Sequence, residues 1–217
     1  MDRFIGKLAE FFLYDNVHDI VVDELAADLR TAGPNQWSLR PIIEKILNSK
    51  AMYSSRALKG KIKNPIEFVM GFLRTTAIDL SANRATNMSR IRAELQNIGQ
   101  VVLDPPDVNG WPNGIAWLGS QAMLERTNFV NFAVLQLDTE DQVNQVTPAA
   151  DAGRSAIQLV DHIAGLLDVQ LSGNARTRLI NYVNEGGVFN PNDFNELKKK
   201  VRGLLWAIAP YHDGHQD

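Results

Sequence analysis

The segment DPPDVNGWPNGIAW (residues 104–117) is the one part of the chain that helical periodicity cannot explain. Its three prolines exclude a regular helix, and its glycines and asparagines tolerate the left-handed backbone conformation that tight turns require. Trp111 and Trp117 carry large apolar rings, which are stabilised when neighbouring helices cover them. We therefore predict an ordered loop that folds back onto helices, with the two tryptophans as its anchors.

Apolar residues recur at helical spacing through most of the chain before this loop. The clearest helix start is Asn64-Pro65-Ile66-Glu67, where Asn64 caps the first turn and Glu67 can bond back to the Asn64 amide. The pattern predicts five helices, which cover residues 3–14, begin near Asn16, follow a cap at Ser38, begin at Asn64, and cover residues 87–98.

The chain after the loop also lacks the alternating pattern of strands. Ser120 is the predicted cap of a long helix that ends near Leu137 and lies at the centre of the bundle. Residues 138–153 hold four acids and little apolar content, so we predict a linker there. Three more amphipathic helices follow, which begin near Ala156, Ala175 and Asn190.

These patterns predict an all-α protein, a single multi-helix bundle of about eight or nine helices. Residues 1–137 would form its core, and residues 154–217 would pack onto that core.

Composition narrows the possible functions. The chain has 217 residues, 45% of them hydrophobic, which is enough for a sizeable core. A net charge of -3 gives no overall cationic field, which argues against a nucleic-acid partner. The absence of cysteine excludes disulfides, thiolate nucleophiles and cysteine-ligated metals. No stretch approaches the roughly 18 apolar residues of a membrane span, and Met1-Asp2-Arg3-Phe4 does not begin a signal peptide.

Polar and aromatic side chains gather in the loop. Paired carboxylates beside an aromatic platform are typical of carbohydrate sites, so the loop is the first candidate ligand site. The alternative is structural, since aspartates in such turns bond their own backbone and buried tryptophans need no ligand; we favour this interpretation. In that case Asp104 and Asp107 cap local amides, and the tryptophans pack against the helices that begin at Asn64 and Ser120. The candidate residues are Asp104, Asp107, Asn109, Trp111, Asn113 and Trp117.

A second candidate is a basic segment around Gly60, where Arg56, Lys61 and Lys63 could contact a phosphate or a carboxylate. We favour the alternative that these are solvated cations which pair with nearby acidic faces. His212 and His215 form the one arrangement that could hold a metal, but a polar chain end explains them better. We therefore predict no metal, no cofactor and no catalytic residue.

Three stretches resemble one bacterial family, called domain of unknown function 1800. They are the loop with its flanks (Gly99-Gln100 to Phe129), the segment from Ser54 to Val69, and Lys200 to Leu205. The resemblance implies a chain that corresponds to the C-terminal half of longer, often exported proteins, with a signal and an N-terminal helical region before it. It also implies a protein partner, because the family is often encoded beside another uncharacterised exported family.

Two functions follow as hypotheses. The first is a non-catalytic scaffold or protein-interaction domain of an exported protein. The second is part of a hydrolase or carbohydrate-active enzyme whose other catalytic groups lie in the N-terminal half. The sequence leaves the oligomeric state open.

Overall fold

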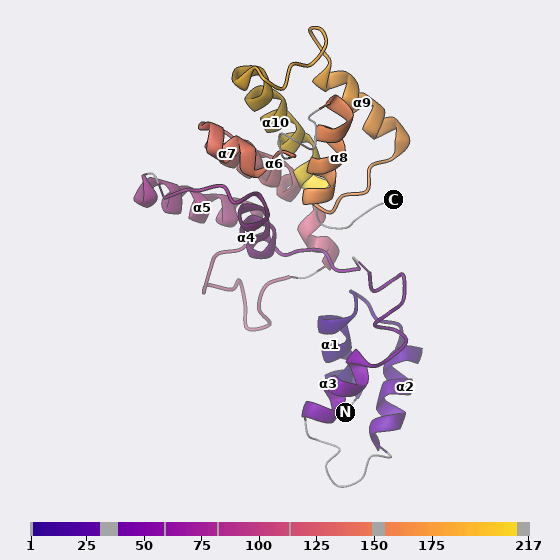
Figure 1. The fold of residues 1–217 in the computed structure, drawn as a ribbon. Coiled ribbons are helices and arrows are strands. Elements are labelled where there is room, and N and C mark those ends of the chain that lie inside the picture. The colour runs from indigo at the N-terminus through magenta and orange to yellow at the C-terminus, as the bar shows by residue number, and fades with distance from the viewer. Residues whose placement is uncertain are drawn as a thin grey trace. The chain divides into compact units, whose positions relative to one another are not determined.

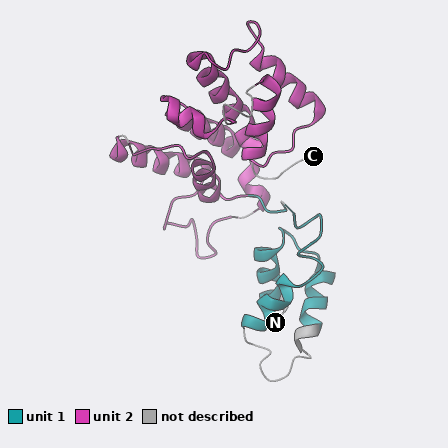
Figure 2. Ribbon diagram, viewed as in Figure 1, with its two compact units in different colours: residues 1–62 teal, residues 63–217 magenta. Residues whose placement is uncertain are grey.

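The computed structural model describes residues 2–30, 39–58, 60–81, 83–112, 114–148 and 155–211. Over these residues the chain is all-α and contains no strand, which confirms the predicted fold class (Figure 1). The sequence predicted one bundle, but the chain divides into two compact units, residues 1–62 (unit 1) and residues 63–217 (unit 2), shown in Figure 2. The physical reason is that each unit buries its apolar faces in its own hydrophobic cluster.

Unit 1 contains three helices that pack pairwise, α1 (Asp2–Phe12), α2 (Asp19–Arg30) and α3 (Leu39–Leu47). Helix α2 begins at Asp19 and not near Asn16, because Asn16 has a left-handed backbone with φ of 55°. The predicted cap Ser38 lies outside the described residues. The most buried side chains of this small core are Ile5, Ala9, Ala26, Ile42 and Ile46.

Unit 2 is arranged around one central helix. Helix α6 (Ser120–Val134) packs against α4 (Pro65–Thr76), α5 (Arg84–Ile98) and α10 (Phe194–Ile208), as its broad apolar surface predicted. Phe129 of α6 is fully buried, and its ring meets those of Phe68 and Phe72 of α4 edge to face, with centroids 6.2 and 6.0 Å apart. The elements of unit 2 are α4 (Pro65–Thr76), α5 (Arg84–Ile98), the 3-10 helix η1 (Gly114–Leu118), α6 (Ser120–Val134), α7 (Glu140–Gln145), α8 (Ala156–Leu166), α9 (Gly173–Val183), α10 (Phe194–Ile208) and the 3-10 helix η3 (Ala209–Tyr211).

The helix ends in unit 2 test the predicted caps. Asn64 and Glu67 form the predicted capping box, because each side chain accepts a hydrogen bond from the other residue's amide at 2.9 and 3.0 Å. Ser120 is not a cap, since Gly119 occupies the cap position of α6 and no side chain bonds there. None of the described helices is long and apolar enough to cross a membrane.

The predicted linker over residues 138–153 needs a correction. Part of it forms the short helix α7, which packs against α10. A capping box between Thr139 and Gln142 starts this helix, and Val143 and Val146 are fully buried in the core of unit 2. The burial of these two valines therefore stabilises a segment whose average composition is polar. Residues 149–153 lie outside the described part of the chain.

The last of three consecutive lysines in α10, Lys200, is buried. Its Nζ donates to the carbonyl oxygens of Tyr182 and Glu185 at 2.7 and 3.0 Å. These carbonyls lie at the C-terminal end of α9, where the helix dipole favours a cation. Lys200 on α10 therefore joins two helices.

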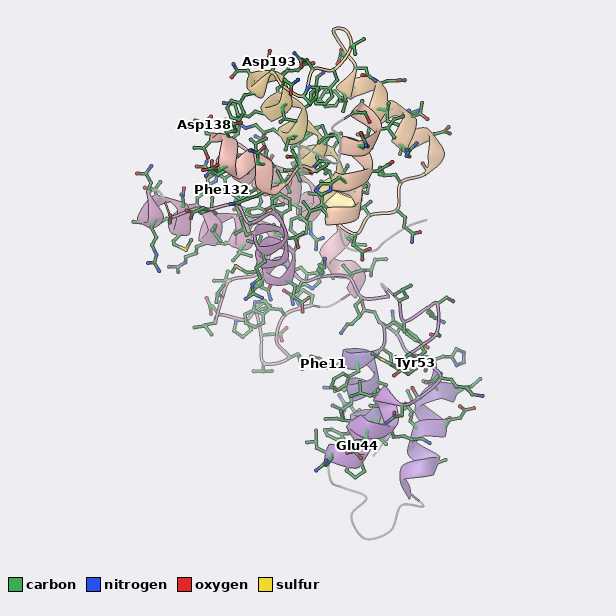
Figure 3. The ribbon with its side chains drawn as sticks, in the orientation of Figure 1. Phe11, Glu44, Tyr53, Phe132, Asp138 and Asp193 are labelled. Atoms are coloured by element: carbon green, nitrogen blue, oxygen red, sulfur yellow. The ribbon has the colours of Figure 1, made fainter. Side chains whose placement is uncertain are left out.

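A second cation of α10, Arg202, binds carbonyl oxygens at the end of α6. Arg202 Nη2 donates to the carbonyl oxygens of Leu135 and Leu137 at 2.9 and 2.8 Å, directly after the end of α6. Asp138, labelled in Figure 3, follows these carbonyls and accepts a hydrogen bond from Lys198 Nζ at 2.9 Å. The polar side of α10 thus positions the helix ends around it.

Candidate functional site

The loop between α5 and α6, residues 99–119, is fixed at its beginning. Gly99 ends α5 with φ of 112°, a left-handed conformation that glycine adopts without strain. The amide of Gln100 then donates to Leu95 O at 2.8 Å, and its buried side-chain oxygen accepts from the amide of Ile66 at 3.0 Å. Because Ile66 lies in the first turn of α4, Gln100 ties the start of the loop to a second helix.

Trp117 anchors the other end of the loop. It lies in η1, only 3% of its surface is exposed, and η1 packs against α6. A Cβ placed on Gly99 would lie 3.5 Å from Trp117 Cζ3, so the indole rests against the backbone at the end of α5. The predicted burial of Trp117 is confirmed, with the α5 terminus as a neighbour that the sequence did not indicate.

Trp111 is only half-buried, so the predicted burial holds in part. Its Nε1 is shielded from solvent and has no hydrogen-bond partner among the described residues. Gly110 before it has φ of 92°, and Pro112 after it has a restricted φ, so the backbone on both sides of Trp111 is restricted in conformation.

The loop carboxylates have different roles. Asp107 Oδ1 accepts a hydrogen bond from the amide of Asn109 at 2.6 Å, which confirms the predicted turn-forming role. The same prediction for Asp104 is wrong, because its exposed carboxylate forms no hydrogen bond or ion pair within the described part of the chain. Asn109 is exposed, and Asn113 lies outside the described residues.

The described positions favour the structural interpretation over a carbohydrate site. A sugar stacks on an exposed aromatic face, but the face of Trp117 is covered and that of Trp111 is partly covered. One of the two acids already stabilises a turn. The five candidate residues that the structure describes lie in one loop, and Asp107 and Trp117 among them have structural roles.

The loop instead exposes aliphatic side chains, which sequence reasoning missed. Leu103 is 91% exposed and Val108 is fully exposed, although contacts of Gln100 and Trp117 anchor both ends of the loop. Leu103 also has φ of 65°, a conformation that costs a branched residue about 1–3 kcal/mol. We call the exposed aliphatic set the loop display, and its members are Val102, Leu103, Val108 and Ile115.

A buried arginine joins α6 to the chain before α4. Arg126 is fully buried, its Nη2 donates to Lys63 O at 2.7 Å, and its guanidinium lies 4.8 Å from the centre of the Phe68 ring. Burial disfavours the charged form and lowers the pKa of Arg126 to about 10, so the side chain stays cationic at neutral pH. Arg126 therefore stabilises the same helix start that Gln100 contacts.

The predicted anion contacts are divided between the two units. In unit 1, Lys61 Nζ donates to Phe11 O at 3.0 Å, near the end of α1, and Arg56 stacks over the Tyr14 ring at 4.9 Å. In unit 2, Lys63 contributes its carbonyl oxygen to Arg126. The two side chains in unit 1 serve helix capping and ring stacking.

No metal site emerges from the described residues, since no three His, Asp or Glu side chains lie close enough to share an ion. His212 and His215, the one metal arrangement the sequence offered, lie outside them.

Comparison with known proteins supports the resemblance found in the sequence. No curated protein and no solved structure matches the chain. One family does match, over residues 1–197, and it is described as "Protein of unknown function (DUF1800)". Since this match covers most of the 217 residues, the chain belongs to that family.

Proposed function

We propose that unit 2 is a non-catalytic protein-interaction domain of an exported protein, and that the loop display contacts the partner. The observation that carries the proposal is an ordered loop whose ends are fixed by Gln100 and Trp117 while its aliphatic side chains face solvent. Exported location rests on the family resemblance alone.

The energetics favour a partner over a purely structural role. Covering apolar surface stabilises by roughly 25 cal/mol per Å², so leaving Leu103 and Val108 in water forgoes that stabilisation. Leu103 occupies the third position of a turn that the hydrogen bond from the Asp104 amide to Val101 O closes at 3.1 Å, and this turn points its side chain into solvent. A partner that covers both side chains would recover this free energy.

The fixed loop ends also favour binding. Association with a flexible loop loses conformational entropy, whereas an ordered loop has already lost it during folding. The capped turn at Asp107 and Asn109 orders the segment between the anchors. The loop is therefore organised for contact before a partner arrives.

The enzymatic alternative has weaker support. Asp104 is free to act as an acid or base, but Asp107 is bonded to its own turn and the indoles are covered. Catalysis would depend on groups supplied by the N-terminal region that the family resemblance implies. No feature of the described residues favours that reaction.

Site-specific photo-crosslinking in the native host tests the proposal. A photoreactive amino acid replaces Leu103 or Val108, and the matched control replaces Val188, which is 95% exposed in the connection between α9 and α10. We expect one protein to be crosslinked at both loop positions and not at Val188. Equal crosslinking at all three positions, or none in the loop, would contradict the proposal.

A second measurement uses the captured partner in purified form. Leu103→Ser should weaken its binding at least about tenfold, because a buried leucine contributes on the order of 2 kcal/mol. Val188→Ser should leave the affinity unchanged. Circular dichroism should show equal helix content in both variants, since both side chains are exposed.

A further inference from the structure

A second feature of unit 2 lies away from the loop, where α9, the end of α10 and the connection before α9 enclose a pocket of about 610 Å³. This volume falls within the range of about 300–1,000 Å³ that is usual for small-molecule sites. Its lining residues are Val169, Gln170, Leu171, Ser172, Ala175, Arg178, Leu179, Ala207, Ile208 and Tyr211.

The walls of the pocket are mainly aliphatic. Leu171 and Leu179 are half-buried and Ile208 is buried, so a ligand would contact side chains that already belong to the core of unit 2. Ser172 offers little extra polarity, because its Oγ caps α9 by accepting from the Ala175 amide at 3.3 Å. An occupant therefore needs an apolar body.

Among the lining residues that the structure describes, Arg178 is the only charged one. It is exposed and forms no ion pair or hydrogen bond among the described residues. Arg176, two residues earlier on the same helix, shows the contrast, since it binds both carboxylate oxygens of Asp161 at 2.7 and 2.6 Å. The Arg178 guanidinium thus retains the two-pronged donor geometry that matches a carboxylate.

From this combination we propose that the pocket binds a small molecule with an apolar body and a single carboxylate. The aliphatic walls bind the body, and Arg178 binds the headgroup at the rim. A single cation suits one negative charge better than a phosphate with two. This site is independent of the loop display and of the protein partner proposed for it.

Calorimetric titration of the full chain with decanoate, below its micelle concentration, tests the proposal. Decanoate should bind with one-to-one stoichiometry, whereas decanol, which lacks the charge, and acetate, which lacks the apolar body, should bind at least about tenfold more weakly. Equal binding of decanol and decanoate would overturn the role of Arg178.

Three variants test whether decanoate binds in this pocket. Arg178→Gln should weaken decanoate binding about tenfold or more, because it removes the charge-assisted hydrogen bonds. Lys199→Gln is the matched control, since it removes one exposed cation from α10 that does not line the pocket, and it should bind as the wild type does. Ala175→Phe should fill the pocket and abolish binding.

Other results would reject the proposal. If Arg178→Gln and Lys199→Gln weaken binding equally, the interaction is non-specific attraction between charges. If an acetylated trileucine with a free carboxylate binds and decanoate does not, the pocket recognises a peptide end and not a small molecule. Circular dichroism verifies folding of each variant, and the exposed Arg178→Gln keeps the test decisive if Ala175→Phe does not fold.

Discussion

The two connections at the ends of α6 differ in whether their valines are buried. In the loop before α6, Val102 and Val108 face solvent, whereas in the segment after α6, Val143 and Val146 are fully buried. Both connections combine acids with turn-forming residues, and neither carries the apolar periodicity of a long helix. The valines after α6 are covered because their helix, α7, packs against α10.

The two connections are also stabilised in different ways. The loop before α6 is ordered by a few anchors, chiefly Gln100 and Trp117, and the rest of its side chains need no neighbour. The segment after α6 is ordered by the burial of its own valines.

The largest expected effect concerns the anchors of the loop. Trp117→Ala should lower the free energy of unfolding by about 3–5 kcal/mol, as large aromatic deletions in cores do. Trp111→Ala should cost about 1–2 kcal/mol, because that ring is only half-buried. Urea unfolding followed by circular dichroism measures both values. Equal losses would show that the two tryptophans anchor the loop together.

A matched pair of valines tests the comparison directly. Val143→Ala removes a fully buried side chain and should cost about 1.5–3 kcal/mol, whereas Val108→Ala removes an exposed one and should change stability by less than about 0.5 kcal/mol. The same urea titration resolves the pair. A loss at Val108 as large as that at Val143 would mean that the loop valine is covered in solution, by a partner or a second copy.

The cation that caps α6 should have an intermediate effect. Arg202→Met removes the hydrogen bonds to Leu135 and Leu137 and should cost about 1–3 kcal/mol, because the two carbonyl oxygens lose a charged donor. Arg92→Met on α5 is the control, since Arg92 is exposed and forms no such contact among the described residues. Thermal unfolding should leave the control within a degree or two of the wild type.

The smallest expected effect depends on pH. The hydrogen bond from Lys198 lowers the pKa of Asp138 below its usual 3.8, with a further contribution from Arg202. A carboxylate whose pKa is lower in the folded state stabilises the fold above its unfolded pKa, and this contribution is lost as the pH falls through the folded value. Asp138→Asn should therefore melt slightly below the wild type at neutral pH.

The wild type and Asp138→Asn should have equal melting temperatures at the acidic end of the titration, below the folded pKa of Asp138. Melting curves at a series of pH values show whether the gap closes. A gap that stays constant through the acidic range would assign the effect to packing and not to the charge of Asp138.

Local features of the sequence determined much of the fold. Helical periodicity predicted the all-α class, and the capping box at Asn64 and the stop at Gly99 appear where the sequence placed them. The turn at Asp107 was also predictable. These features depend on contacts within a few residues of one another, so the local sequence contains the interactions that form them.

Only the tertiary structure decided which side chains of the connections are covered. The burial of Lys200, the short helix α7 and the exposure of Leu103 each depend on whether a distant helix lies within reach. The division between unit 1 and unit 2 has the same origin, since amphipathic faces match many partners equally well in sequence. Apolar burial is non-directional, so a local pattern specifies that a face needs a partner without specifying which one.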